Sequence, residues 1–260
     1  MDLRMTKRDK QVLRSAQHDS DKQGLRSARD DSDKQGLRFA QNDIYRRLAE
    51  HDGPPPVPFP ADPFEQILWE QVGYMVADPK RRSAFEALRA RVGLAPLAIA
   101  RAKPATLMQI ARLGGSIAAD LRAQRMVTSA ELVLRQYDGD LTRVLALPLE
   151  DARTALAAFP MIGEPGADKI LAWCGAARLV PLDSNALRVV TRLGLVDEAK
   201  DYRAWYRTAR AVLVVPKQAT ARWCADAGQL LRRHGQVTCK RTSPKCGACV
   251  LRAGCPSGSS

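Results

Sequence analysis

Residues 239–255 have the sequence CKRTSPKCGACVLRAGC, which puts four of the six cysteines of the 260-residue chain in one short segment. Their spacing is C-x6-C-x2-C-x5-C, and the ligands on offer are Cys239, Cys246, Cys249 and Cys255. Structural zinc sites usually combine two separate C-x2-C pairs, whereas four thiolates wrapped around one centre suit a [4Fe-4S] cluster. We therefore expect a [4Fe-4S] cluster as cofactor, with zinc as the alternative.

The charge of the chain indicates a polyanionic partner. Lys and Arg number 41 against 28 Asp and Glu, a formal net charge of +13. Basic side chains placed on phosphates release condensed counterions, so such a surplus favours nucleic acid as the partner. High arginine content that follows from genome composition is the alternative explanation.

The sequence contains nothing that predicts a membrane protein or an exported one. The N-terminus, MDLRMTKRDK, is followed by no apolar segment, and nowhere do eighteen apolar residues run together. We expect no membrane partner and a cytoplasmic location, associated with the nucleoid.

The N-terminal part repeats a twelve-residue unit. Residues 13–43 contain LRSAQHDSDKQG, LRSARDDSDKQG and LRFAQND, each with one leucine and few other apolar residues. Such copies cannot build a core, so residues 1–52 are predicted to be a disordered tail of low complexity. Residues 53–62, within GPPPVPFPADP, are predicted to be a proline-rich linker.

From residue 63 onwards the apolar pattern predicts helices. Phe64, Ile67, Leu68, Val72 and Met75 recur at spacings of three and four, and Pro63 suits the first turn of a helix. Similar stripes follow to about residue 234, with Gly or Pro between them, and no stretch shows sustained period-two alternation. The fold class is therefore predicted to be all-α.

Two more stretches could carry chemistry. In FPMIGEPGADKI, residues 159–170, Pro160 ends one helix, Gly163 is free to adopt positive φ, and the next helix starts near Pro165. The N–H groups of that helix start could bind a phosphate, although most such turns only connect packed helices. In PLDSNALRVV, residues 181–190, Asp183 is a good N-cap, which is also a purely structural role.

These three motifs, in this order, resemble the helix-hairpin-helix DNA glycosylase superfamily with a C-terminal iron-sulfur cluster, the family of endonuclease III and the MutY-type adenine glycosylases. The likeness covers roughly residues 60–256. The cysteine spacing matches the family's cluster loop at every interval, after LLRRHGQVTC, where the family has a helix ending in His-Gly. FPMIG stands where the family has a Leu-Pro-Gly-Val-Gly hairpin, and LDSN stands where it has the catalytic aspartate.

The resemblance implies a two-lobed fold and a reaction. Residues 63–256 would form the glycosylase domain, with a six-helix lobe at about 80–193 and a cluster lobe at about 63–79 plus 194–256. Such enzymes flip a nucleotide out of the duplex and hydrolyse its N-glycosidic bond. Asp183 matches the carboxylate that stabilises the oxocarbenium-like sugar. Glu70, counted from Pro63 and Phe64, matches a catalytic glutamate of the MutY type and is expected to protonate the leaving base or handle water.

The resemblance also implies where DNA is bound. The contacts are expected in the hairpin, in the helix after Asp183 and in the basic cysteine loop: Pro160, Met161, Ile162, Gly163, Gly166, Lys169, Asn185, Arg188, Lys240, Arg241 and Lys245. Lys169 is expected to be solvated or to face a phosphate. Tyr74 is expected to pack between helices rather than stack on an extruded base.

One departure from the family bears on the reaction class. Bifunctional members have a lysine nucleophile two residues after the last glycine of the hairpin, and here that position is Pro165. We therefore expect a monofunctional DNA glycosylase of base excision repair, a monomer acting on double-stranded DNA with a damaged or mismatched base. The alternatives are a non-catalytic protein of the same fold that binds DNA lesions, and a bifunctional endonuclease III-like glycosylase/AP lyase.

Overall fold

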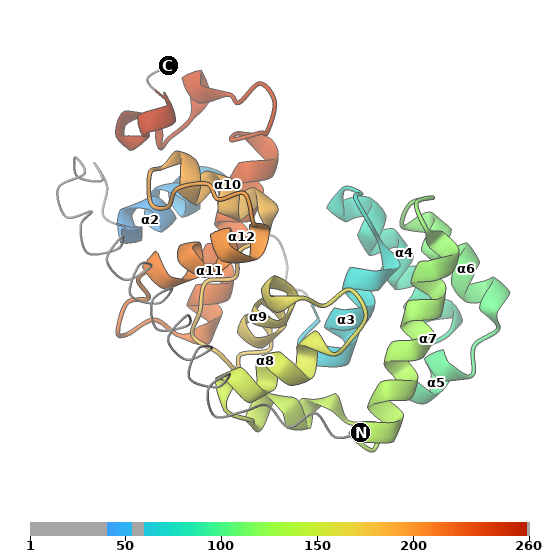
Figure 1. Ribbon diagram of the computed structural model, residues 1–260. Coiled ribbons are helices and arrows are strands. Elements are labelled where there is room, and N and C mark those ends of the chain that lie inside the picture. Colours follow the sequence, from blue (N-terminus) through green and yellow to red (C-terminus); the bar gives the residue numbers. More distant parts are fainter. Residues whose placement is uncertain (1–40, 54–59, 259–260) are drawn as a thin grey trace, which may run out of the picture.

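The computed structural model describes residues 41–53 and 60–258, and every regular element in these ranges is helical (Figure 1). The α-helices are α2 (Gln41–Asp52), α3 (Pro63–Val72), α4 (Asp78–Arg91), α5 (Pro96–Ala100), α6 (Pro104–Leu113), α7 (Ala119–Gln136), α8 (Leu149–Ala157), α9 (Glu164–Trp173), α10 (Ser184–Arg192), α11 (Tyr202–Val212) and α12 (Ala221–Val237). Short 3₁₀ helices are η2 (Leu141–Ala146), η3 (Cys246–Ala248), η4 (Arg252–Gly254) and η5 (Pro256–Gly258). The all-α prediction is confirmed. Within the described ranges, no helix is both long enough and apolar enough to cross a membrane.

Proline marks the start of several of these helices. It occupies one of the first two positions of α3, α4, α5, α6 and α9. The missing N–H of proline costs nothing there, because the first N–H groups of a helix have no intrahelical acceptor. At α3 the Asp62 side chain also accepts a hydrogen bond from the backbone N–H of Glu65 at 3.0 Å. The helix start predicted at Pro63 is therefore confirmed.

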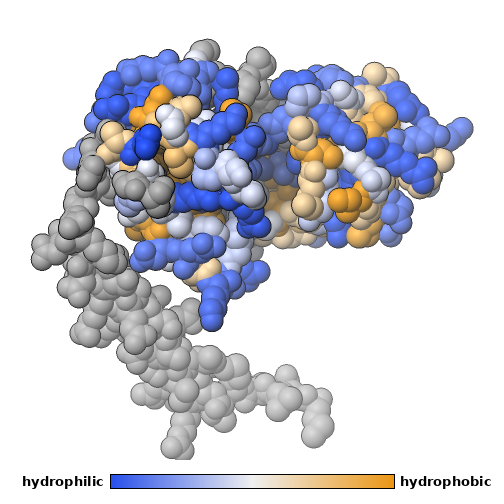
Figure 2. Space-filling model, turned by 90° about the horizontal axis from the view of Figure 1, so that it is seen from above, coloured by the Kyte–Doolittle hydropathy of each residue, from blue (hydrophilic) through white to orange (hydrophobic). Residues whose placement is uncertain are grey.

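Two separate hydrophobic cores divide the described chain into two lobes. The first core is built by α3 to α9 and includes Phe64, Phe85, Met126, Leu156 and Ile170. The second is built by α2 and α10 to α12, with the C-terminal loop against it, and includes Leu48, Leu187, Tyr206 and Leu231. In Figure 1 the two groups meet where α9 lies beside α11 and α12 and are separated between α10 and α4, and Figure 2 shows a hollow in the surface between them.

The division between the lobes differs from the predicted one at both ends. Helix α3 was expected in the cluster lobe, but its stripe, with Phe64 and Ile67, belongs to the first core. Helix α10 was expected in the six-helix lobe, but Leu187 and Val190 belong to the second core, where α10 packs along α12. The chain therefore changes lobes near residue 180, just before Asp183.

Residues 41–52 also differ from the prediction, which placed them in the disordered tail. They form α2, which buries Ile44, Tyr45 and Leu48 in the second core. The amide of Gln41 bonds the backbone at both Val212 and Val214, at 2.9 and 2.7 Å. These three apolar side chains lie on one helical face, a pattern absent from the earlier repeat copies. The predicted tail up to residue 40 and linker residues 54–59 lie outside the described residues.

Candidate functional site

Asp183 is the N-cap of α10, as predicted, and its carboxylate is held on both oxygens. Oδ1 accepts hydrogen bonds from the backbone N–H groups of Asn185 and Ala186, both at 2.9 Å. Oδ2 accepts from Arg232 Nε at 3.0 Å and from the Asn185 side-chain amide at 3.3 Å. The side chain is 24% exposed, so it is not sealed inside a helix–helix contact.

Two glycines of α12 let this segment approach very closely. A Cβ at Gly228 would lie 2.6 Å from the carbonyl oxygen of Pro181, and a Cβ at Gly235 would lie 2.6 Å from that of Asn185. Both distances are shorter than a Cβ atom tolerates, so the two positions require glycine. The backbone on either side of Asp183 is thus packed directly against α12, which fixes where the carboxylate stands.

Arg232, from the same helix, connects Asp183 to the other lobe. Its NH1 and NH2 groups donate to the two oxygens of Asp78, the first residue of α4, both at 2.6 Å. Burial raises the pKa of the Asp78 carboxyl, but the Arg232 guanidinium outweighs burial and holds that pKa below its usual range. Burial lowers the pKa of Arg232, and its two carboxylate partners raise it by more. Asp78 and Arg232 are therefore both charged at neutral pH.

Glu70 lies in a second set of ion pairs, at the end of α3. Its Oε1 is 2.6 Å from Lys169 Nζ, and its Oε2 is 3.4 Å from NH1 of Arg81. The Glu70 side chain is 20% exposed and that of Lys169 is 16% exposed. Burial raises the pKa of the Glu70 carboxyl, but the combined attraction of Lys169, Arg81 and Arg232 lowers it below its ordinary value. Glu70 is thus ionised in the free protein.

The position of Lys169 corrects the expectation that it is a solvated or phosphate-facing charge. Besides the ion pair with Glu70, its ammonium lies 5.3 Å from the centroid of the Trp173 ring. Lys169 faces inward because it stands one helical turn beyond the start of α9, on the side of that helix that packs against α3. The ammonium of Lys169, which was expected to face a phosphate, is instead ion-paired with the candidate catalytic Glu70.

Asp78, Arg81 and Arg232 are site residues that the sequence analysis missed. Asp78 and Arg232 are 154 positions apart, so no local motif contains both. One signal was present: Arg232 follows Gly228 by four residues and precedes Gly235 by three, which puts it on the glycine face of a helix. A charge on a face reserved for close packing needs a partner, and here Asp78 and Asp183 supply it.

The loop between α3 and α4 carries two exposed apolar side chains next to these charges. Tyr74 is 43% exposed and Met75 is 78% exposed, so the expectation that Tyr74 packs between helices is wrong. Buried Arg122 holds the loop in place, donating to the carbonyl oxygens of Val72 at 2.5 Å and of Ala111 at 2.8 Å. Glu70 precedes this loop and Asp78 follows it, so the loop joins the two ion-paired segments.

The hairpin between α8 and α9 differs in detail from the prediction. The N–H of Ile162 donates to the carbonyl of Phe159 at 3.0 Å, and Met161 has φ +70°, as the third residue of a type II turn does. Gly163, expected to supply the positive φ, has φ −92° and is the N-cap of α9. Ile162 is 3% exposed, so its side chain anchors the turn in the core and is not free to touch DNA.

The rest of the predicted hairpin surface is accessible. Gly163 is exposed, and Pro160, Met161 and Gly166 are half-buried. Glu164, which would repel a phosphate, is neutralised by Arg207, whose Nε lies 2.9 Å from a Glu164 oxygen. The hairpin can therefore face a polyanion without an uncompensated negative charge.

Beneath the hairpin, Asp168 joins α9 to α11. It is fully buried and pairs with Arg153 of α8, with the hydroxyl of Tyr206 at 2.6 Å and with Arg210 at 3.1 Å. Because Tyr206 and Arg210 belong to the second lobe and Asp168 to the first, this network fixes the lobes to each other on the hairpin side.

The predicted DNA contacts near the cysteines fall into two groups. Asn185 and Arg188 are turned inward: Arg188 donates to the Asn185 side chain at 3.0 Å, to Cys239 O at 3.0 Å and to Gly235 O at 2.7 Å. Arg188 thereby ties α10 to the cysteine loop, and the expectation that it contacts a phosphate stays a prediction. The other group is exposed: Lys240, Arg241 and Lys245.

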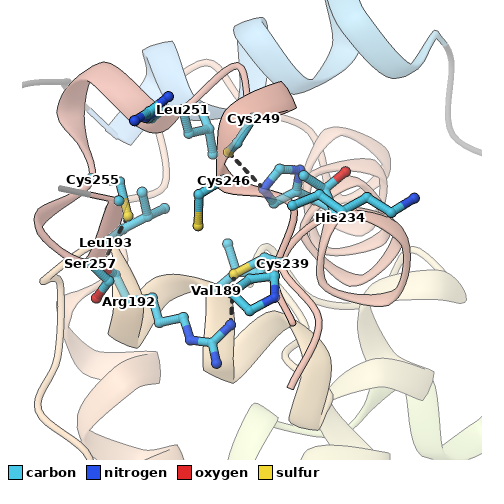
Figure 3. A pocket seen from close by; sticks show the side chains of 15 residues that line it. Val189, Arg192, Leu193, His234, Cys239, Cys246, Cys249, Leu251, Cys255 and Ser257 are labelled. Atoms are coloured by element: carbon cyan, nitrogen blue, oxygen red, sulfur yellow. Dashed lines mark hydrogen bonds between the residues drawn. The ribbon is translucent and has the colours of Figure 1, made fainter. Parts of the chain in front are cut away.

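All four C-terminal cysteines line one cavity of about 220 Å³, together with His234 and Leu251 (Figure 3). Their sulfurs surround this space, and neighbours hold some of them: Cys249 Sγ is 3.5 Å from His234 Nε2, and Cys239 Sγ is 3.5 Å from Arg192 NH1. Among the described residues, no group of three or more His, Cys, Asp or Glu is arranged to hold a single metal ion. Four thiols around one cavity are the donor set that a [4Fe-4S] cluster uses, so the prediction of this cofactor, with zinc as the alternative, stays a prediction.

Comparison with known proteins agrees with this architecture. No protein-family model matches the chain. Endonuclease III of Sulfolobus acidocaldarius is 27% identical over 196 residues, which are 74% of this chain and 81% of that protein. Endonuclease III of Escherichia coli is 25% identical over 134 residues, which are 52% of this chain and 56% of that protein.

Solved structures extend the agreement over most of the chain. A trapped endonuclease III–DNA covalent intermediate superposes with a TM-score of 0.68 at 17% identity, covering 85% of this chain and 98% of that one. A thermostable thymine-DNA glycosylase superposes with a TM-score of 0.66 at 15% identity, covering 84% and 96%. The resemblance drawn from the sequence is thereby confirmed: the chain has the fold of the helix-hairpin-helix DNA glycosylases, and its sequence is similar to endonuclease III.

Proposed function

We propose that this protein is a monofunctional DNA glycosylase that hydrolyses the N-glycosidic bond of a flipped damaged or mismatched nucleotide. The observation that carries the proposal is the fixed, partly exposed carboxylate of Asp183, set where the two lobes meet and bonded to Arg232, whose charge also acts on a second carboxylate, Glu70. The similarity to endonuclease III in sequence and fold supports the same reaction class.

Asp183 would stabilise the positive charge that develops on the sugar as the bond to the base breaks. Its two N–H donors and Arg232 prevent the carboxylate from turning away, so the negative charge is in place before the reaction. Glu70 would orient the attacking water rather than protonate the base, because the ion pairs with Lys169 and Arg81 keep it ionised.

Two features of α9 support hydrolysis over lysine-dependent strand cleavage. Pro165 stands where bifunctional relatives have the nucleophilic lysine, and proline offers no amine. Lys169, one turn further on, is only 16% exposed and has its Nζ 2.6 Å from the Glu70 carboxylate, so its side chain is engaged by that ion pair.

The hairpin and the cysteine loop would bind the DNA backbone. Exposed Lys240, Arg241 and Lys245 would contact phosphates, and their loss should flatten the salt dependence of DNA affinity by about 0.9 in log–log slope for each contact removed. Tyr74 and Met75 would press against bases beside the extruded nucleotide, as apolar wedges do in bent duplexes.

A [4Fe-4S] cluster held by the four C-terminal cysteines would keep the basic loop rigid. When bound, the cluster would supply the cross-links that hold this segment in shape, because the segment has few apolar side chains of its own. The protein would act as a monomer on double-stranded DNA, in the cytoplasm at the nucleoid.

The test is base release from duplexes that each carry one lesion or mismatch, detected by hot-alkali cleavage. Uracil, thymine mismatches and oxidised pyrimidines belong in the panel. Asp183→Asn is the decisive variant, because asparagine caps a helix as well as aspartate does and only the charge is removed. Release by the wild type that disappears in Asp183→Asn supports the proposal; release that survives in the variant contradicts it.

The second candidate is a non-catalytic protein that binds distorted DNA. It is favoured by the ion pairing of all three carboxylates, Glu70, Asp78 and Asp183, in the free protein. This candidate predicts tight binding to lesion duplexes without base release from any of them. A bifunctional lyase predicts instead an adduct trapped by borohydride, which the absence of a free amine at position 165 argues against.

A further inference from the structure

The bridge from Asp78 through Arg232 to Asp183 joins the two lobes at the candidate catalytic carboxylate. Asp78 opens α4 in the first lobe, whereas Arg232 and Asp183 belong to the second. The guanidinium uses both terminal nitrogens on Asp78 at 2.6 Å and its Nε on Asp183 at 3.0 Å. Three of its five N–H donors are thereby committed in one rigid fork.

This bridge differs from the polar network that joins the lobes under the hairpin. The Asp168 network under the hairpin is built around a side chain with no exposure. In the bridge, the side chains of Asp78, Arg232 and Asp183 are 30%, 18% and 24% exposed. The Asp168 network is therefore sealed from solvent, while the bridge is partly open to it.

We propose that Arg232 and Asp78 are positioning residues that set the orientation of the Asp183 carboxylate according to how the two lobes are closed, so that the site is aligned only when Asp78 holds Arg232. The inference rests on the proposed glycosylase function, and it names two residues that act on the sugar only through Asp183.

The charges of the bridge give Asp78 a second effect. A guanidinium at 3.0 Å from Asp183 would cancel much of the negative field that stabilises a sugar cation. The bidentate carboxylate of Asp78 balances that guanidinium, so the bridge as a whole keeps one net negative charge. Removing the Asp78 carboxylate would leave the Asp183–Arg232 pair with no net charge. It would also remove the partner that fixes the orientation of the Arg232 guanidinium.

The experiment compares Asp78→Asn, Arg232→Met and the double variant with a matched control pair on the exposed face of α12. Arg222 and Asp226 form that pair, with Nε 2.9 Å from the carboxylate and the Arg222 side chain 66% exposed. Arg222→Met and Asp226→Asn make the same changes of charge on the same helix, away from the bridge. Base release is measured under single-turnover conditions with saturating enzyme, and DNA affinity is measured separately.

We expect each bridge variant to slow base release on the order of 10²-fold, the usual cost of a catalytic group displaced by about 1 Å, with affinity changed no more than in the matched control. Because both residues act through one bridge, the double variant should be no slower than the slower single variant. Arg232→Lys, which keeps the charge but not the fork, should recover only part of the rate. Wild-type rates in both single variants, or additive losses in the double variant, would overturn the proposal.

A measurement that needs no activity keeps this inference separate from the proposed function. The backbone N–H groups of Asn185 and Ala186 donate to Asp183, so their hydrogen exchange reports how firmly the carboxylate is held. In both bridge variants these amides should exchange at least about fivefold faster than in the controls. Should the wild type release no base from any duplex, the proposed function fails, while faster exchange would still support the positioning role and unchanged exchange would overturn it.

Discussion

Replacing Gly235 by alanine should move the candidate catalytic carboxylate without touching it. The added Cβ would lie 2.6 Å from Asn185 O, against a lower limit of 3.0 Å for such contacts, so α12 and the segment after Asp183 must separate by about 0.4 Å. Overpacking of this kind costs about 1–3 kcal/mol, and alanine returns about 1 kcal/mol of helix propensity. We expect a net loss of up to about 2 kcal/mol, which lowers Tm by up to about 8 °C in a domain of this size.

The assay for Gly235→Ala is thermal unfolding together with single-turnover base release on the best duplex of the panel. Gln236→Ala, the next residue of the same helix and exposed, is the matched control. Base release should fall by about tenfold or more at a temperature where both variants are folded, because the Asn185 backbone carries one of the N–H donors to Asp183. A Tm and a rate equal to those of the control would refute the reasoning that close packing on α12 sets the carboxylate.

Three further predictions concern other parts of the molecule. The Glu70 carboxyl has a lower pKa in the folded protein than its value of about 4 in the unfolded chain, so it stabilises the fold above that unfolded pKa and this stabilisation is lost as the pH falls through the folded pKa. Lys169→Met should lower the free energy of unfolding by about 1–3 kcal/mol at pH 7 and flatten the acid side of a plot of Tm against pH. Cys249→Ser should abolish bound iron and visible absorption and lower Tm, whereas normal iron content in this variant would contradict the cluster assignment. Met161→Gly should raise stability by about 1 kcal/mol, because φ +70° is strained in methionine and not in glycine; an unchanged urea midpoint would contradict this.

The helices and the cap of the site were predictable because local forces set them. Proline at the helix starts, apolar stripes at spacings of three and four, and an aspartate just before α10 act through neighbouring residues. The cysteine spacing pointed to the fold for the same reason, since all four cysteines that carry the resemblance lie in one short segment. A single sequence is enough for features of this kind.

The hairpin shows where local reasoning stops. A turn of this type needs a positive φ at its third residue, which is Met161. Gly163 stands two positions later, and the prediction gave it the positive φ because glycine adopts that conformation most easily. Burial of Ile162 decides the matter, because anchoring that side chain in the core places Met161, and not Gly163, at the strained position. Tertiary packing thus overrides the glycine preference here.

The ion pairs of the site were beyond the sequence because they join elements that are distant along the chain. Lys169 is 99 positions from Glu70, and Arg232 is 154 positions from Asp78. Which of the many charges of a strongly basic chain come together depends on how the two lobes close. The ion pair of Lys169 with Glu70 supports the proposal that Lys169 does not take the place of the lysine that bifunctional relatives have at the position of Pro165.

The charge balance of the site follows from these pairs and bears on the choice between catalysis and binding. A carboxylate that must stabilise a sugar cation needs a field that its own neighbours do not cancel. Asp183 has that field only because Asp78 takes the two terminal nitrogens of Arg232, leaving the single Nε for Asp183. A scaffold that only bound DNA would gain nothing from a second carboxylate on this arginine, since a free guanidinium in the hollow would attract phosphates more strongly. The bridge therefore favours an enzyme over a binding protein.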